Sequence, residues 1–384
     1  MKKLTPMALQ SLVFSLLTIL LVLAKTEPVL CEYTSIFSFG DSYTDTGNLI
    51  CLYPNESGFH FPYGETYFGH PTGRFSNGRL IVDFLAQSLG LPLLPPYLAR
   101  KSGQEFRRGV NFAVAGATAL DNAFFEERGI DYPYTNISLG NQLSWFKELL
   151  PSLCDQSSSK SLFLVGEIGG NDYVYSFSAG RSLEEIRTFV PDVIDAISSA
   201  IQLVVKHGAV TVMVPGNIPM GCLSLFLTQF QSSNEEDYDP QTGCLRWLNE
   251  FSMYHNHLLQ KELNRMQELH PHVTFIYADY YNASMRFFRH PHQFGFSKGS
   301  LTACCGGGGP YNYNKSLLCG NRGASVLNDP SLYADWDGEH MTEAAYKTIA
   351  SYILQGFNDI PDSSHQYLTL ITSKEYRASL LQNS

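Results

Sequence analysis

The sequence predicts an α/β fold in which helices cover both faces of a five-stranded parallel sheet. Five short runs rich in Val, Ile and Phe lead into Gly or Asp, as buried strands do, and they are Ser35–Phe39, Val110–Val114, Leu162–Val165, Val210–Val214 and Val273–Tyr277. Segments with helical periodicity lie between these runs. Continuously apolar strands that alternate with helices are typical of a parallel sheet buried on both faces.

The expected helices carry apolar side chains at helical spacing, and they are Leu80–Leu89, Leu143–Leu150, 183–206, 245–269 and Ala344–Phe357. Within 245–269, we interpret the stripe of Trp247, Phe251, Tyr254 and Leu258 as core packing. The chain shows no internal repeat and no linker long enough to divide it. We therefore expect one domain over residues 31–360, followed by a C-terminal tail, 361–384.

Four Gly- and Pro-rich stretches form long connections, and they are 51–78, 118–140, 216–243 and 286–335. In an open parallel sheet, the loops at the carboxyl ends of the strands form the ligand crevice. The walls of a binding pocket are therefore expected to come from these connections.

The N-terminus predicts a secretory signal peptide. Lys2 and Lys3 precede an apolar stretch from Leu12 to Leu23, and small residues suited to cleavage occur at Ala24 and Cys31. About 12 apolar residues fall short of the ~20 that a membrane-spanning helix needs. We expect residues 1–30 to be removed, with cleavage between about 24 and 31. The mature protein would then be secreted, or delivered to the vacuole, without a membrane anchor.

Sequons and cysteines agree with an oxidising export route. Four Asn-x-Ser glycosylation sequons begin at Asn55, Asn136, Asn282 and Asn314. The eight cysteines allow four disulfides if Cys31 survives cleavage, and otherwise one thiol is left unpaired. Cys222 with Cys244, and Cys305 with Cys319, are candidate pairs because each brackets a short loop.

Charge and motifs argue against three kinds of ligand: nucleic acid, metal ions and phosphate bound by a phosphate loop. The formal net charge of −10 argues against nucleic acid, because phosphate binding needs a basic surface. No C-x-x-C occurs, and the pairs His255/His257, His270/His272 and His290/His292 are interpreted as surface histidines rather than metal ligands. The run Gly306–Gly309 lacks the Lys-Ser/Thr of a phosphate loop and is expected to be a turn pinned by a disulfide.

Residues able to carry out ester hydrolysis follow the predicted strands. Ser42 comes after the first strand and can act as the nucleophile, with His340 as its base. Asp337 precedes His340 by three residues and can hold the imidazole tautomer. The Ser42 and Gly116 backbone N–H groups and the Asn171 amide can donate to the oxyanion of a tetrahedral intermediate.

These blocks resemble the GDSL, or SGNH, esterase/lipase family, and within it the plant branch of acetylajmalan and sinapine esterases. Ser42, Gly116, Asn171 and His340 stand in the family's order, and the likeness runs from about Thr34 to about Gly356. The resemblance implies a flavodoxin-like three-layer α/β/α sandwich, no metal or other cofactor, and hydrolysis or transfer of acyl groups on a small-molecule ester. Tyr43 replaces the Leu of the family motif and should tune packing while leaving the chemistry intact. Met341 replaces a common Pro, which should alter only the entry to the last helix.

Other interpretations remain beside this one. Ser42 or Asp337 can cap a helix, Asn171 and Asp172 can form an Asx turn, and Asp45 is expected to stabilise the nucleophile loop. Gly295-Phe296-Ser297-Lys298-Gly299 is a literal G-x-S-x-G, but its surroundings lack the strand and helix of a nucleophile elbow. Besides hydrolysis, the residues fit an acyltransferase with an alcohol acceptor, or a glycoprotein that binds esters or glycans without turnover. The substrate's acyl and alcohol parts and the oligomeric state are not encoded in these motifs.

Overall fold

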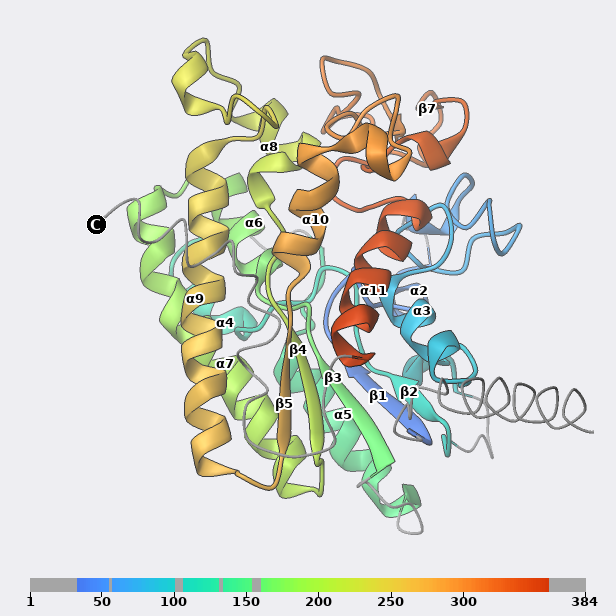
Figure 1. Ribbon diagram of the computed structural model, residues 1–384, viewed down its shortest axis with the longest axis vertical. Helices are drawn as coiled ribbons and strands as arrows, with labels where there is room; N and C mark the ends of the chain where they lie inside the picture. Colours follow the sequence, from blue (N-terminus) through green and yellow to red (C-terminus); the bar gives the residue numbers. More distant parts are fainter. Residues whose placement is uncertain (1–32, 55–56, 101–105, 131–133, 154–159, 359–384) are drawn as a thin grey trace, which may run out of the picture. The chain divides into compact units, whose positions relative to one another are not determined.

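The computed structural model describes residues 33–54, 57–100, 106–130, 134–153 and 160–358, and it confirms a five-stranded parallel sheet (Figure 1). The strands are β1 (Ser35–Phe39), β2 (Gly109–Asn111), β3 (Ser161–Val165), β4 (Thr211–Pro215) and β5 (Thr274–Ala278). Their order is β2-β1-β3-β4-β5, and every pairing is parallel. This is the flavodoxin-like order. In such sheets ligands bind at the carboxyl ends of β1 and β3, where the strand order reverses.

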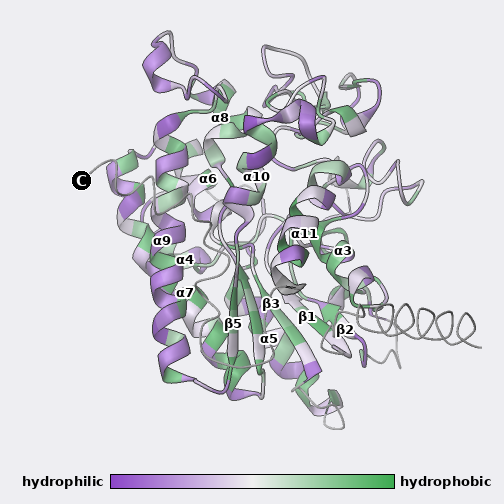
Figure 2. Cartoon of the chain, in the orientation of Figure 1, coloured by the Kyte–Doolittle hydropathy of each residue, from purple (hydrophilic) through white to green (hydrophobic). Residues whose placement is uncertain are grey.

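Helices form a layer on each face of the sheet. The helices α3 (Ile81–Ser88), α10 (Tyr280–Arg289) and α11 (Glu343–Asn358) pack on one another, and so do α5 (Leu139–Leu149), α7 (Leu183–Lys206) and α9 (Arg246–Leu269). Phe37 and Phe39 of β1 both meet the ring of Phe146 on α5, which anchors one layer to the sheet. The strands are largely green in Figure 2, as expected for a sheet covered on both faces.

Shorter elements lie within the connections, and they are α2 (Leu49–Leu52), α4 (Asn122–Glu126), α6 (Gly170–Ser178), α8 (Ser224–Gln229) and the antiparallel pair β6 (Cys305–Gly306) and β7 (Ser325–Val326). The connections that carry α8 and β7 lie beyond the sheet, at the top of Figure 1. The disulfides Cys222–Cys244 and Cys305–Cys319 are both present, as expected. Of the other cysteines, Cys51 and Cys304 are free, while Cys31 and Cys154 lie outside the described residues.

The longest apolar helix is a core helix. In the part of the chain that the structure describes, α7 alone is long and apolar enough to cross a membrane by composition. Its apolar stripe, which includes Ile186, Val193 and Ile201, is buried, and the helix packs against α5, α6, α9 and β3. Ser182 caps its first turn by accepting a hydrogen bond from the Glu185 N–H.

Several predicted bounds were wrong. The second strand ends at Asn111 rather than Val114, because the Asn111 side chain turns the chain by bonding the Thr44 carbonyl and the Ala113 N–H. The helix expected from Leu143 begins four residues earlier, at Leu139, after Ser138. The helices α6, α8 and α10 were missed because they are short and do not carry a long periodic pattern.

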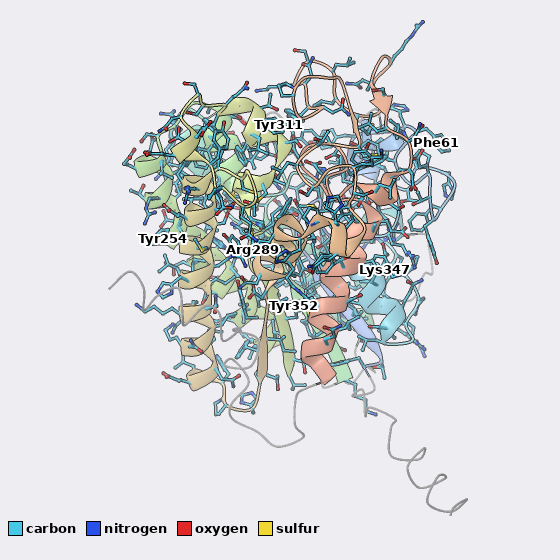
Figure 3. The ribbon with its side chains drawn as sticks, turned by 45° about the horizontal axis from the view of Figure 1, so that its top comes forward. Phe61, Tyr254, Arg289, Tyr311, Lys347 and Tyr352 are labelled. Carbon is cyan, nitrogen blue, oxygen red and sulfur yellow. A yellow bond between two sulfur atoms is a disulfide. The ribbon has the colours of Figure 1, made fainter. Side chains whose placement is uncertain are left out.

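The interpretation of all three histidine pairs as surface residues is wrong for His255. This side chain is fully buried on the inner face of α9, where its Nδ1 lies 2.8 Å from the Tyr173 hydroxyl, and burial lowers its pKa to about 3. It is a neutral core histidine. Of the stripe interpreted as core packing, Phe251 is fully buried, whereas Trp247, Tyr254 and Leu258 are half-buried and pack against the core. The Arg187 guanidinium lies over the Tyr254 ring. Tyr254 is labelled in Figure 3.

Candidate active site

The turn that carries Ser42 is fixed against two neighbouring elements. Gly40 has a φ of +151°, and a Cβ at this position would lie 2.7 Å from the Glu167 carbonyl oxygen, so the close approach of β1 and β3 requires glycine. The Gln142 amide of α5 accepts from the Gly40 N–H at 2.9 Å and donates to its carbonyl at 2.8 Å. The Asp41 N–H donates to the Glu167 carbonyl. Ser42 therefore follows a backbone held on both sides.

Asp45 holds the rest of this turn, as expected from the sequence. Its carboxylate accepts hydrogen bonds from the Gly47, Asn48 and Leu49 N–H groups and from the Ala115 N–H. The first three bonds close the loop on itself, and the fourth ties it to the chain beyond β2. Asp45 is fully buried and lies within this network, so its role is structural.

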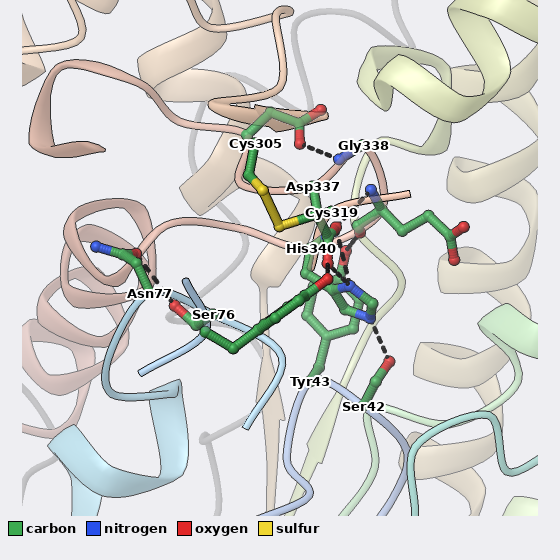
Figure 4. A network of polar contacts seen from close by, with 12 residues as sticks. Ser42, Tyr43, Ser76, Asn77, Cys305, Cys319, Asp337, Gly338 and His340 are labelled. Atoms are coloured by element: carbon green, nitrogen blue, oxygen red, sulfur yellow. Dashed lines mark hydrogen bonds and ion pairs between the residues drawn. A yellow bond between two sulfur atoms is a disulfide. The ribbon is translucent and has the colours of Figure 1, made fainter. Parts of the chain in front are cut away.

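Three residues predicted as the catalytic group lie in hydrogen-bond contact, although they come from opposite ends of the chain (Figure 4). The His340 Nε2 is 2.7 Å from the Ser42 Oγ, and the His340 Nδ1 is 2.8 Å from the Asp337 Oδ2. All three side chains are buried. A carboxylate can only accept, so Nδ1 carries the proton in the neutral ring and Nε2 is free to accept from the serine hydroxyl.

The Asp337 carboxylate is fully satisfied in its ionised form. Its Oδ1 accepts from the Glu339 and His340 N–H groups at 3.0 and 2.8 Å, and the Tyr63 hydroxyl donates to Oδ2 at 2.8 Å. Burial alone would raise the pKa of Asp337, but His340 and these donors bring it below its ordinary value. Tyr63 comes from the long connection before α3, and motif reasoning had given it no role.

The electrostatics of His340 favour a base. Burial would lower its pKa, but the charge of Asp337 and the hydrogen bond to it hold the pKa above the ordinary value of 6.5. The imidazole ring lies between aromatic neighbours, with centroid distances of 4.9 Å to Phe75 and 5.8 Å to Tyr43. These contacts limit its rotation.

Tyr43 links the two halves of the site. Its hydroxyl donates to the Glu339 carbonyl at 2.6 Å, and its ring packs edge-on against Tyr346 of α11. The residue that departs from the family motif therefore joins the Ser42 turn to the turn that carries Asp337 and His340. Buried Asp335 supports the latter turn by accepting from the Gly338 N–H and the Ser224 hydroxyl.

The two further predicted donors differ in their surroundings: Asn171 lines the pocket at Ser42, whereas Gly116 is not among the residues that line it. Gly116 has a φ of +80°, and a Cβ there would lie 2.8 Å from the Tyr134 ring and 2.9 Å from the Tyr175 hydroxyl, so the position excludes side chains. The Asn171 amide nitrogen donates to the Ala117 carbonyl at 2.9 Å and, less closely, to the Asp41 Oδ2 at 3.2 Å. Asn171 lies in the first turn of α6, whereas the next residue, Asp172, is buried and accepts from the Ala119 and Leu120 N–H groups.

A small pocket opens at the Ser42 hydroxyl, with a volume of about 40 Å³. We call it the Ser42 pocket, and its lining residues are Asp41, Ser42, Tyr43, Glu167, Gly170, Asn171, Val174, Asn217, Ile218, Met220, Leu223, Leu225, Glu339 and His340. Burial raises the pKa of Asp41 to about 6, and burial together with the charge of Asp41 raises that of Glu167 well above its usual value. Both causes disfavour the ionised form of Glu167.

The competing serine lies in a different setting. Ser297 is exposed and follows the short 3-10 helix Pro291–Phe294 and the turn at Gly295, with no strand before it. The strand-turn-helix of a nucleophile elbow is absent at this position. Within the described residues no group of three or more His, Cys, Asp or Glu side chains is arranged to hold a metal ion.

The sequons differ in accessibility. Asn136 and Asn314 are exposed, and Asn55 lies outside the described residues. Asn282 is half-buried in the first turn of α10, where its amide donates to the Asp279 Oδ2 at 2.7 Å. The predicted signal peptide, 1–30, and the tail, 361–384, also lie outside the described residues.

Comparison with known proteins identifies the same family that the four sequence blocks resemble. A model of GDSL-like lipases and acylhydrolases matches residues 36–353. Two GDSL esterase/lipases of Arabidopsis thaliana are 51% and 52% identical; the first alignment covers 93% of this chain and 94% of the relative, and the second 92% and 93%. The sinapine esterase of Brassica napus is 48% identical, over 88% of this chain and 89% of its own.

Proposed function

This chain is a carboxylic ester hydrolase of the GDSL-like lipase/acylhydrolase family, and we propose that it works through an acyl-enzyme formed on Ser42. The observation that carries the proposal is the continuous contact from the Ser42 Oγ through the His340 ring to Asp337. An alcohol attacks an ester only when a base removes its proton, and this chain of contacts supplies that base and its partner.

The reaction has two halves. His340 Nε2 takes the hydroxyl proton while the Ser42 oxygen attacks the ester carbonyl, and it then gives the proton to the departing alcohol. Water enters and attacks the acyl-enzyme while His340 takes its proton; His340 then gives this proton to the departing Ser42 oxygen, which releases the acid and restores the enzyme. Asp337 stays ionised and stabilises the imidazolium formed in both halves.

Backbone and side-chain donors would stabilise the oxyanion. The Ser42 and Gly116 N–H groups are two of them, and Asn171 is the third. The bond from Asn171 to the Ala117 carbonyl fixes its amide, and the longer contact to Asp41 is the one that the oxyanion would replace. Removing one such donor typically costs about 2.7–4 kcal/mol of transition-state stabilisation.

The direct test of the acyl-enzyme is covalent labelling. A fluorophosphonate should attach to Ser42 and to no other serine, because Ser42 is the only serine among the described residues whose hydroxyl contacts a buried imidazole. Mass spectrometry of the digested protein locates the label. Modification of Ser297 instead, or no modification in a protein that hydrolyses esters, would contradict the proposal.

The pH dependence should follow His340. The base must be neutral to act, and Asp337 holds the pKa of His340 above 6.5 in the free enzyme. We therefore expect kcat/KM to fall as pH decreases, with its midpoint above pH 6.5 rather than at it. The measurement is kcat/KM for one ester across pH 5 to 9. A flat profile between pH 5 and 8 would show that no group of this kind limits the reaction.

We also propose that the enzyme is secreted as a glycoprotein. The two disulfides, the apolar N-terminal stretch and exposed sequons at Asn136 and Asn314 support this. Among the described sequons, Asn282 is the least suited to glycosylation, since a glycan on its amide would break the hydrogen bond with Asp279.

A further inference from the structure

Asn217 is buried beside the nucleophile, yet its side chain has no partner. It lies two residues after the end of β4, is 2% exposed, and lines the Ser42 pocket. Neither its Oδ1 nor its Nδ2 makes a hydrogen bond to any described residue. Buried amides are nearly always hydrogen-bonded, because burial without a partner is costly.

The fold holds Asn217 by its backbone alone. The Asn256 amide of α9 accepts from the Asn217 N–H at 2.7 Å and donates to the Asn217 carbonyl at 2.9 Å. Gly216 permits this approach, since a Cβ there would lie 2.2 Å from the Tyr277 hydroxyl and 2.7 Å from the Asn256 Oδ1. The main chain is therefore fixed without help from the side chain, which remains available for a ligand.

The rest of the pocket leaves Asn217 as its open polar group. Glu167 follows β3, the neighbour of β4, and also lines the pocket, but its carboxyl is paired with that of Asp41. Much of the remaining wall is apolar and includes Val174, Ile218 and Leu225. The Asn217 amide thus lies in a mainly hydrophobic pocket that also contains the reacting hydroxyl.

We propose that Asn217 forms a subsite for a neutral hydroxyl-bearing group of the substrate, next to the scissile ester. This inference rests on the proposed function of Ser42. An amide offers both a donor and an acceptor, which matches the acceptor and donor of a hydroxyl. No Lys or Arg lines the pocket, whereas Asp41 and Glu339 do, so an anionic group would find no counter-charge there.

A site whose polar groups are paired by the substrate discriminates against an analogue that lacks the partner, because binding the analogue leaves those groups buried and unpaired. Esters without the hydroxyl should therefore be poorer substrates.

The test compares matched esters in the wild-type protein and in Asn217→Leu. An acyl pair, 4-nitrophenyl butyrate and 4-nitrophenyl 3-hydroxybutyrate, and an alcohol pair, butyl acetate and 4-hydroxybutyl acetate, cover both sides of the ester. For each pair the ratio of kcat/KM with and without hydroxyl is measured. Dividing the wild-type ratio by the variant ratio removes differences in intrinsic reactivity.

We expect this double ratio to be about ten or more for one of the two pairs. Hydrolysis of the plain ester by Asn217→Leu reports that the variant is folded, and Asn217→Ala serves the same test if Leu does not fit. Ile218→Val is the matched control: it changes the neighbouring wall without changing polarity, so its double ratio should stay near one.

The outcome separates this inference from the proposed function. Double ratios near one for both pairs, in a protein whose hydrolysis is lost in Ser42→Ala, would overturn the subsite and leave the acyl-enzyme intact. Activity retained in Ser42→Ala would instead remove the proposed function, whatever the double ratios.

Discussion

Ser42→Ala should reduce kcat for ester hydrolysis by about 10⁶-fold, because no other serine among the described residues contacts a buried imidazole. What remains would come from the oxyanion donors and substrate binding, which the substitution leaves in place. The measurement is the initial rate of a chromogenic ester at saturating concentration. The unfolding temperature should change little, since only the bond from the Ser42 Oγ to His340 is lost.

Ser297→Ala is the matched control. Ser297 belongs to the literal G-x-S-x-G, but it is exposed and lacks the setting of a nucleophile. Its variant should hydrolyse the same ester at the wild-type rate. If Ser42→Ala kept full activity while Ser297→Ala lost it, the assignment of the nucleophile would have to be reversed.

Asp337→Asn should lower kcat by about 10⁴-fold through the tautomer of His340. The retained amide oxygen would still accept from the Glu339 and His340 N–H groups, which bond Oδ1 in the native turn. The amide nitrogen would then occupy the place of Oδ2 and present hydrogens to the His340 Nδ1. The imidazole proton moves to Nε2, where it blocks acceptance of the Ser42 proton.

The same substitution makes a second, independent prediction about pH. Loss of the Asp337 charge removes the main cause that raises the pKa of His340, so the midpoint of the residual kcat/KM profile should move to lower pH. Asp329→Asn is the control, because Asp329 is exposed in the same connection and asparagine tolerates its left-handed φ of 57°. Equal losses of activity in both variants would indicate a general effect of charge rather than a role for Asp337.

The fold was predictable because its main signals are local. The β1 run Ser35–Phe39 is continuously apolar and is followed at once by the Gly40-Asp41-Ser42 turn, and the strand's observed bounds are the predicted ones. The helix over 183–206 was equally predictable from its long stripe of apolar residues at helical spacing. In contrast, α10 has only ten residues and follows β5 after a single residue, so no pattern separated it from a loop.

The residues that surround the catalytic group could not be predicted from the sequence in this way. Tyr63 and Asp337 are 274 positions apart, and Gly40 and Gln142 are 102 positions apart. Nothing in the spacing of either pair indicates a contact. The role of Asn217 was even less predictable, because a side chain's lack of hydrogen-bond partners is known only when the positions of all its neighbours are known.

By itself the sequence determined the strand and helix pattern, the order of the four blocks and the residue types available for chemistry, since periodicity and side-chain chemistry are properties of neighbouring residues. Only the tertiary structure decided that the Ser42 hydroxyl meets the His340 ring, that Tyr63 and Tyr43 hold the turn that carries His340, and that Asn217 is left open. The physical reason is that these are contacts between distant segments, set by how strands and helices pack, and packing has no period along the chain.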